Sequence, residues 1–180
     1  MALTKISEQT VSGAAIAEIT SGIDSTYKLY KIKYINVNPA SSGASVYLEF
    51  QVNESGGGGW NEQVVGTFIK SAHYVGGTGN FSYDSGVDTQ GTTFIKLFQG
   101  VGPGATENVS GELYLFNPSG TGKVKHWWTI NNGIYGPYAT RGTTNPFVGG
   151  YFDTTAAIDE VRFKMSDDGN FDGYFSLWGL

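Results

Sequence analysis

The sequence contains no cysteine, so neither disulfide bonds nor thiolate metal sites contribute to its structure. It contains only two histidines, His73 and His126, which lie far apart in the chain and have no carboxylate at ligand spacing. A zinc site needs about three protein ligands, which the histidines do not supply. The sequence therefore predicts no cofactor.

Charged residues are scarce, at 15% of the chain against roughly 25% in an average domain. The formal net charge of -5 argues against binding to nucleic acid or to an anionic membrane surface, because both need clustered Lys and Arg. No apolar run approaches the roughly 18 residues of a membrane-spanning helix, and the N-terminus lacks the pattern of a signal peptide. We expect a protein that is made in a cytoplasm and is not inserted in a membrane.

Glycine and aromatic residues are abundant: the chain has 27 Gly, 11 Tyr, 11 Phe and 4 Trp. This composition favours a β-rich fold with many turns. A chain of 180 residues buries about 70% of its unfolded surface, which suffices for one core. We expect a single domain over residues 1–180, with a short N-terminal arm at about residues 1–10.

Period-two alternation predicts the strands, and it is cleanest at 45–53, where Val46, Leu48 and Phe50 share one side. Further strands are expected at 27–37, 64–75, 92–98, 111–117 and 123–132, and less clearly at 9–20. Residues 134–147 are interpreted as a long loop. With about nine or ten antiparallel strands and no helical periodicity, the sequence predicts an all-β fold, namely a single jelly-roll-like β-sandwich.

The strand expected at 27–37 changes phase midway. Tyr30, Ile32 and Tyr34 share one side, whereas Ile35 and Val37 lie on the other. This pattern indicates either a β-bulge or a strand that is covered on both faces.

The last stretch, 158–180, alternates on both sides of a turn cluster, SDDGNFDG. Two alternating runs around such a cluster predict a β-hairpin. The apolar residues Trp178 and Leu180 are expected to dock in a sheet or against a neighbouring subunit.

The same turn cluster resembles half of a calcium loop, because Asp168, Asn170 and Asp172 alternate as oxygen ligands do in such loops. The position of the closing bidentate Glu is occupied by Gly179. Asp, Asn and Gly also favour tight turns for backbone reasons, and a plain turn is the favoured interpretation.

No pattern indicates an enzyme. The glycine run at 56–59 is not followed by Lys-Ser or Lys-Thr, so it is not a phosphate-binding loop. The adjacent carboxylates Asp159 and Glu160 point to opposite faces of a strand, and Asp167 and Asp168 are likewise adjacent, so neither pair flanks a glycosidic bond. The sequence predicts a non-enzymatic protein.

Aromatic residues in or beside loops are the main recognition candidates, because exposed rings stack on sugars or form protein interfaces. These candidates are Trp60, Trp127, Trp128, Tyr135, Tyr138 and Tyr151. Core packing is the alternative role for most of them.

Several phrases resemble a family of marine bacteriophage structural proteins: TSGIDSTYKLYKIKYINVNPA, FQVNESGGGGWNEQ, GELYLFNPSGTGKVKH and the closing TTAAIDEVRFKMSDDGNFDGYFSLWGL. In that family the chain closes on an LYGI-like motif, which is LWGL here. The resemblance implies a virion component. We expect it to be made in the host bacterial cytoplasm and to lie on the virion surface. It carries no catalytic or binding residues with it.

A tail fibre usually has a long shaft, whereas the expected β domain begins within about ten residues of Met1, which favours a capsid decoration or head-surface protein. The alternatives are a tail-fibre tip or tail-attached receptor-binding protein, with a host-surface glycan as ligand, and a carbohydrate-binding module. Sparse charge and surplus apolar surface predict a homo-oligomer, with a trimer expected from the habit of virion surface proteins, in contact with other capsid or tail proteins.

Overall fold

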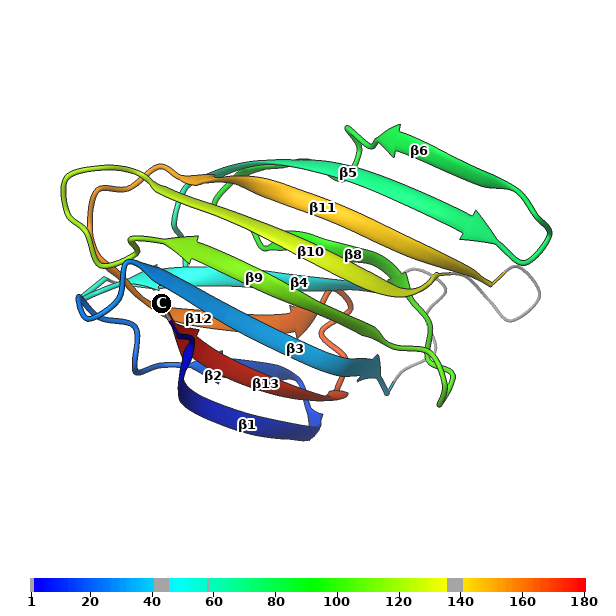
Figure 1. Ribbon diagram of the computed structural model, residues 1–180, viewed down its shortest axis with the longest axis horizontal. Helices are drawn as coiled ribbons and strands as arrows, with labels where there is room; N and C mark the ends of the chain where they lie inside the picture. The colour runs from blue at the N-terminus through cyan, green and yellow to red at the C-terminus, as the bar shows by residue number, and fades with distance from the viewer. Residues whose placement is uncertain (1, 41–45, 58, 136–140) are drawn as a thin grey trace.

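The structure is a computed structural model that describes residues 2–40, 46–57, 59–135 and 141–180. Within these ranges the chain is all-β, with antiparallel strands, and contains no helix that could span a membrane (Figure 1). The strands are β1 (Thr4–Ala14), β2 (Ile16–Ile19), β3 (Leu29–Pro39), β4 (Val46–Glu54), β5 (Val64–Tyr74), β6 (Gly79–Tyr83), β7 (Thr89–Gly91), β8 (Ile95–Val101), β9 (Val109–Phe116), β10 (Lys125–Tyr135), β11 (Gly142–Phe152), β12 (Ile158–Met165) and β13 (Phe171–Gly179).

The prediction of an all-β fold is confirmed, but the described residues form 13 strands and not nine or ten. The stretch expected as one strand at 9–20 is divided into β1 and β2. Strands β6 and β7 lie between the strands expected at 64–75 and 92–98, in a segment where no strand was expected. The residues expected as an N-terminal arm belong to β1 from Thr4 onward, because β1 pairs along its length with β13.

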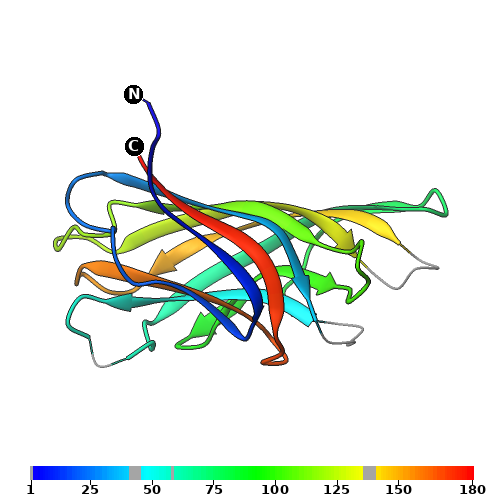
Figure 2. The same cartoon turned by 90° about the horizontal axis from the view of Figure 1, so that it is seen from below.

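The strands form two layers (Figure 2). The larger layer has the order β1-β13-β3-β9-β10-β11-β5, with β6 and β7 both on the outer edge of β5. The smaller layer has the order β8-β4-β12-β2. The layers join at one corner, where Tyr135 of β10 pairs with Val101 of β8, so the whole forms a nearly closed, flattened barrel.

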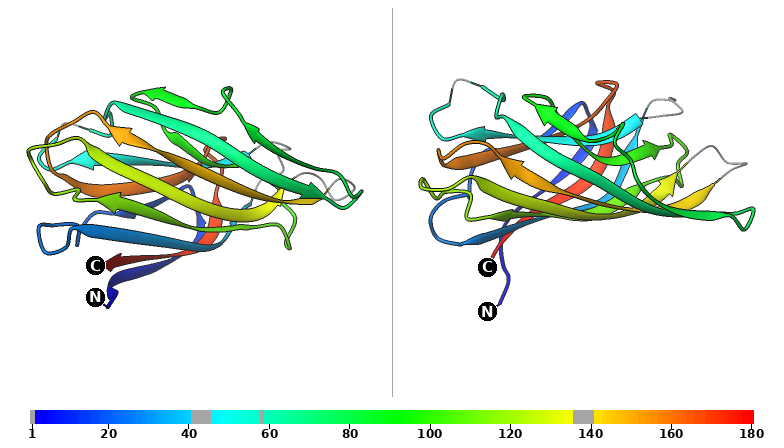
Figure 3. Two further views of the ribbon diagram at one scale, coloured as in Figure 1. Left: turned by 45° about the horizontal axis from the view of Figure 1, so that its top comes forward. Right: turned by 90° about the horizontal axis from the view of Figure 1, so that it is seen from above.

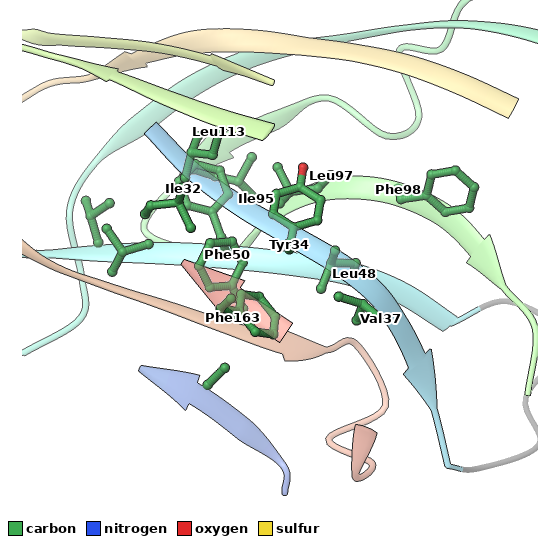
Figure 4. Packing of buried hydrophobic residues seen from close by; sticks show 14 of the residues in the cluster. Ile32, Tyr34, Val37, Leu48, Phe50, Ile95, Leu97, Phe98, Leu113 and Phe163 are labelled. Atoms are coloured by element: carbon green, nitrogen blue, oxygen red, sulfur yellow. The ribbon is translucent and has the colours of Figure 1, made fainter. Parts of the chain in front are cut away.

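The core lies between the two layers and is rich in aromatic rings (Figure 4). Phe50 of β4 is near its centre, with its ring centroid 6.2 Å from that of Phe163 and 5.2 Å from that of Trp127. All three side chains are almost fully buried. The alternation in β4 that predicted an inward face at Val46, Leu48 and Phe50 is therefore confirmed.

The phase change in β3 is a β-bulge, which is one of the two interpretations that the sequence allowed. The pairing of β3 with β9 shifts between Tyr34 and Val37, and Asn36 has a left-handed backbone with a φ of 54°. Asn adopts this conformation more readily than most residues. The bulge returns Val37 to the same core as Tyr34, and Ile35 is left 41% exposed.

The prediction of a C-terminal hairpin is wrong. Strand β12 pairs with β2 and β4 in the smaller layer, whereas β13 pairs with β1 and β3 in the larger layer. The turn at 166–170 therefore carries the chain from one layer to the other, and the two strands meet through side chains, with the Phe163 and Phe175 centroids 5.0 Å apart. The last residues do dock in a sheet: Leu29 and Leu180 exchange backbone hydrogen bonds of 2.9 and 3.3 Å.

The prediction of a long loop at 134–147 is also wrong for the residues of this segment that the structure describes. Ile134 and Tyr135 end β10, and Gly142 to Phe147 begin β11. This segment contains Gly and Pro, and Pro cannot donate to a sheet ladder, so its local preference is against a strand. Pairing of β11 on both sides, with the 11-residue strands β5 and β10, outweighs that local preference.

Candidate functional site

The structure corrects the position of one recognition candidate, Trp127. Its side chain is only 2% exposed and packs between Phe50 and Phe152 in the core, so it does not form a surface for recognition. The sequence places a Trp on each face of this strand, and the inward one is Trp127. Its neighbour Trp128 lies on the outer face, half-buried.

The other candidates do not form one cluster. Trp60 packs on Arg162 at the outer face of the smaller layer, with the guanidinium carbon 4.4 Å from the ring centroid. Tyr135 lies at the end of β10 beside Tyr74. Tyr151 contacts His126 on the outer face of the larger layer. Tyr138 lies outside the described residues.

The two terminal candidates are part of the sheet. Trp178 of β13 is half-buried on the outer face of the larger layer, and the Lys33 ammonium lies 5.2 Å from its ring centroid. Leu180 is half-buried and paired to β3 through its backbone. The apolar end of the chain is therefore accommodated within the subunit.

The residues of the calcium half-motif are directed to different partners. Asp168 accepts a hydrogen bond of 2.6 Å from Lys164, and Asp172 accepts one of 2.8 Å from the backbone N–H of Gly13. The backbone carbonyl of Asn170 accepts from Ala40 N–H at 2.8 Å. Asp168 also has a left-handed backbone, with a φ of 57°, as turn residues often do. The geometry is that of the plain turn.

A ladder of stacked side chains crosses the outer face of the larger layer. Trp128 of β10 stacks on Tyr114 of β9, with centroids 3.9 Å apart and planes 17° apart. Phe147 of β11 also stacks on Trp128, with ring centroids 5.9 Å apart and planes 26° apart. The Lys31 ammonium of β3 lies 4.5 Å from the Tyr114 centroid. Ring faces of Tyr114 and Trp128 are thus used in contacts within the protein.

A charged cluster around Glu112 borders this ladder. Glu112 forms ion pairs with Lys31 at 2.9 Å and Lys33 at 3.8 Å, and accepts a hydrogen bond of 2.6 Å from the Tyr114 hydroxyl. Burial raises the pKa of Glu112, but the hydrogen bonds from Tyr114 and Lys31 and the charges of both lysines outweigh burial and hold that pKa below its ordinary value. The cluster fixes the lysines over neighbouring rings.

Beyond this cluster the outer face becomes apolar. Ile130, Phe147, Ile69 and Tyr83 are successive cross-strand partners on β10, β11, β5 and β6, and therefore lie in one row on the same face. Ile130 is 53%, Phe147 45% and Tyr83 60% exposed. Phe81, on the same face of β6, is 78% exposed. We call these five residues the outer apolar row.

Sequence reasoning missed the outer apolar row. Its only local signal is the alternation of Phe81 and Tyr83 in GNFSY, which is weak beside the glycines that precede it. The remaining members come from three strands whose pairing is not visible in the sequence. Strand register alone brings them together.

The outer face of the smaller layer is charged. Arg162 lies between the rings of Trp60 and Phe94, at 4.4 and 4.9 Å from their centroids, and donates to the Gln51 side chain at 2.8 Å. Glu49 of β4 is only 7% exposed on this face, near Lys164. Burial raises the pKa of Glu49, and the charges of Lys164 and Lys96 only partly oppose that effect.

Replacing Glu49 with glutamine is expected to raise the melting temperature at about pH 7 and to change it little at about pH 4. Because the pKa is raised in the folded state, the stabilisation by protonated Glu49 is present below the unfolded-state pKa and is lost as pH rises through the folded-state pKa. Glutamine does not ionise, so the Glu49→Gln protein keeps this stabilisation at neutral pH. Thermal melts of both proteins across this pH range measure the difference.

The matched control is Glu112→Gln, because the pKa of Glu112 is shifted downward. Its carboxylate contributes stability above the unfolded-state pKa, and that contribution is lost as pH falls through the folded-state pKa. This variant should therefore melt at a lower temperature than the wild type near neutral pH, and the gap should close in acid. A Glu49→Gln protein that is less stable than wild type at neutral pH would contradict the assignment.

No family model, curated protein or solved structure matches the chain. Among the described residues, no group of three or more His, Asp or Glu is placed to hold a metal ion. The outer face of the larger layer, with its stacked ladder and outer apolar row, is the surface best suited to a function. Its chemistry is that of contact with another macromolecular surface.

Proposed function

We propose that this protein is a non-enzymatic structural protein on the surface of a bacteriophage virion. It is made in the cytoplasm of the host bacterium and acts by packing against other virion proteins. The observation that carries the proposal is the outer apolar row, since contiguous exposed apolar side chains on a soluble domain mark an association surface. The resemblance of the sequence to marine phage structural proteins supplies the setting.

We place the protein on the head, as a capsid decoration protein. A receptor-binding tip that recognises glycans needs free aromatic faces on which sugar rings stack. On the larger layer, the rings of Tyr114 and Trp128 stack on each other, and Lys31 covers Tyr114. This arrangement favours a surface that packs against protein over one that binds sugar.

Immunogold electron microscopy of intact virions tests the location. Antibody raised against the purified protein is expected to label heads in many copies, and preincubation with the purified protein should remove the label. Label confined to the distal end of the tail would replace the head assignment with the tail-tip alternative. Unlabelled virions from cells that contain the protein would overturn the virion proposal itself.

A host-binding measurement independently distinguishes a head protein from a receptor-binding protein at the tail tip. Fluorescently labelled protein is expected not to bind host cells in a saturable manner. Saturable binding that is lost in Tyr151→Ala, with an unchanged melting temperature, would support the receptor-binding alternative. Tyr151 suits this test because it lies half-buried on the outer face, paired only with His126 among the ring contacts of the described chain.

A further inference from the structure

Strand β6 forms an edge of the larger layer that no other strand of the described residues covers. It pairs only with β5 in the part of the chain that the structure describes, and it lies along the border of the molecule in Figure 1. Edge strands usually carry a charge, a proline or a bulge that prevents pairing with another chain. The sequence of β6, GNFSY, has no charge or proline, and its register with β5 is unbroken.

The opposite edge of the same layer differs. Strand β1 carries an ion pair between Lys5 and Glu8 at 3.0 Å and has two register shifts in its pairing with β13. Charges and irregular pairing are the usual protection of an edge. The contrast within one sheet indicates that β6 is left open for a partner.

The backbone of β6 offers a defined set of hydrogen-bonding groups. Bonds from Asp84 N–H to Phe68 C=O, at 3.0 Å, and from Tyr74 N–H to Thr78 C=O, at 2.8 Å, flank its ladder with β5. In an antiparallel ladder such bonds recur at every second residue. The N–H and C=O groups of Gly79, Phe81 and Tyr83 therefore point away from β5.

The most exposed large apolar side chains among the described residues gather on this hairpin. Val75 is 81%, Phe81 78% and Tyr83 60% exposed. The hairpin of β5 and β6 extends to one end of the molecule in both views of Figure 3. It is accessible to a second large molecule.

Both charged side chains next to β6 have hydrogen-bonding partners within the subunit. Asp84 forms an ion pair with Lys70 at 2.9 Å. Asp88 accepts hydrogen bonds from the Phe68 backbone and from the Tyr83 hydroxyl. Strand β6 itself contains no charged residue, so no charge on the strand repels an identical edge.

We propose that β6 pairs with β6 of a second copy of this chain, antiparallel and about a two-fold axis at Phe81. Phe81 then faces Phe81 of the other copy, and Gly79 faces Tyr83, so the outward groups of all three residues meet as about six hydrogen bonds. The pairing joins the two larger layers into one continuous sheet. It also places both copies of Phe81 and Tyr83 side by side on the outer face.

A second copy is the occupant because the edge is complementary to itself. Its middle residue, Phe81, is its most exposed apolar residue, and its free backbone groups are arranged symmetrically around that residue. A two-fold contact of this kind closes on itself and gives a dimer. The trimer expected for virion surface proteins is not built by this edge. The pairing holds whether or not the protein is a virion component.

Sedimentation and light scattering of the full chain at micromolar concentrations test the dimer. The wild type is expected to show twice the mass of one chain. Phe81→Lys is expected to be a monomer, because two lysines would face each other across the axis at a Cα separation of about 5.5 Å. Ile130→Lys, on the same face but on the central strand β10, should remain a dimer.

A cysteine cross-link tests the register. Since the chain has no native cysteine, Phe81→Cys introduces a single thiol, and paired Cα atoms about 5.5 Å apart are within disulfide reach. Oxidation is expected to give a covalent dimer of Phe81→Cys and none of Phe147→Cys. Unchanged melting temperatures show that the variants fold.

Three results would overturn the proposal. The first is a wild type that is monomeric throughout the micromolar range. The second is a mass of three chains. The third is a dimer that Ile130→Lys abolishes and Phe81→Lys leaves intact, since that pattern belongs to face-to-face packing of the outer apolar row.

Discussion

Replacing Trp127 with alanine is expected to lower the free energy of unfolding by about 3–5 kcal/mol, the range for removal of a large buried aromatic side chain. The ring is 2% exposed and packs against Phe50 and Phe152, 5.2 and 5.9 Å away between centroids. Its indole N–H has no hydrogen-bond partner among the described residues, so the loss is one of packing. Denaturant unfolding measures the change.

The adjacent residue provides the control. Trp128 is half-buried on the outer face and gains mainly from stacking on Tyr114, an interaction worth about 0.5–1.5 kcal/mol beyond the area it buries. Trp128→Ala should therefore cost clearly less than Trp127→Ala. Equal losses in the two variants, or a larger loss at Trp128, would show that the inward and outward faces of β10 are assigned the wrong way round.

Replacing Asn131 with leucine is expected to lower the free energy of unfolding by about 2–4 kcal/mol, because buried polar groups lose their partners. Asn131 is 1% exposed, and its amide donates to Leu97 C=O at 3.1 Å and to Thr129 Oγ1 at 2.9 Å. It also accepts a hydrogen bond from the Tyr34 hydroxyl. The side chain thereby connects β3 and β10 of the larger layer to β8 of the smaller one.

A double-mutant cycle with Tyr34→Phe isolates that last contact. In the wild type, Tyr34→Phe removes the hydroxyl that donates to Asn131, which leaves one acceptor unpaired in the core. In the Asn131→Leu background the hydroxyl has already lost this partner, so the same change should cost less or should stabilise the protein. Strictly additive losses would mean that the two side chains do not interact.

The sequence predicted strands well where one face is apolar, but it did not predict which strands pair. The alternation in Val46 to Val52 follows from packing of the apolar side of β4 in the core, although Glu49 and Gln51 on its other side are also buried. Residues 158–180 alternate equally well in a hairpin and in a turn between two layers, because in both cases each strand buries one side. The choice between the two arrangements depends on strands that are distant in sequence, because β12 pairs with β4 and β13 pairs with β3.

The candidate surface was less predictable still. Trp127 and Trp128 are adjacent, and the apolar residues on both faces of β10 leave the inward side undecided from the strand alone. Partner strands decide it: Gly66 of β5 provides room, since a Cβ atom at that position would lie only 3.0 Å from the Trp127 ring. The outer apolar row needs the correct register of four strands, and a shift of one residue would turn any member away.

The place of β13 in the sheet has a consequence for synthesis on the ribosome. Strands β1 and β3 come early in the chain, but each lies against β13 and not against the other. Their shared neighbour, residues 171–179, emerges more than 130 residues after β3 ends, as the distance in sequence from Pro39 to Phe171 shows. Until then the nascent chain holds two strands with unpaired edges. Because β13 is the last of the described strands, the sandwich closes only after nearly all of the described chain has been made. The non-local pairing that then follows takes on the order of milliseconds to seconds in β-rich domains.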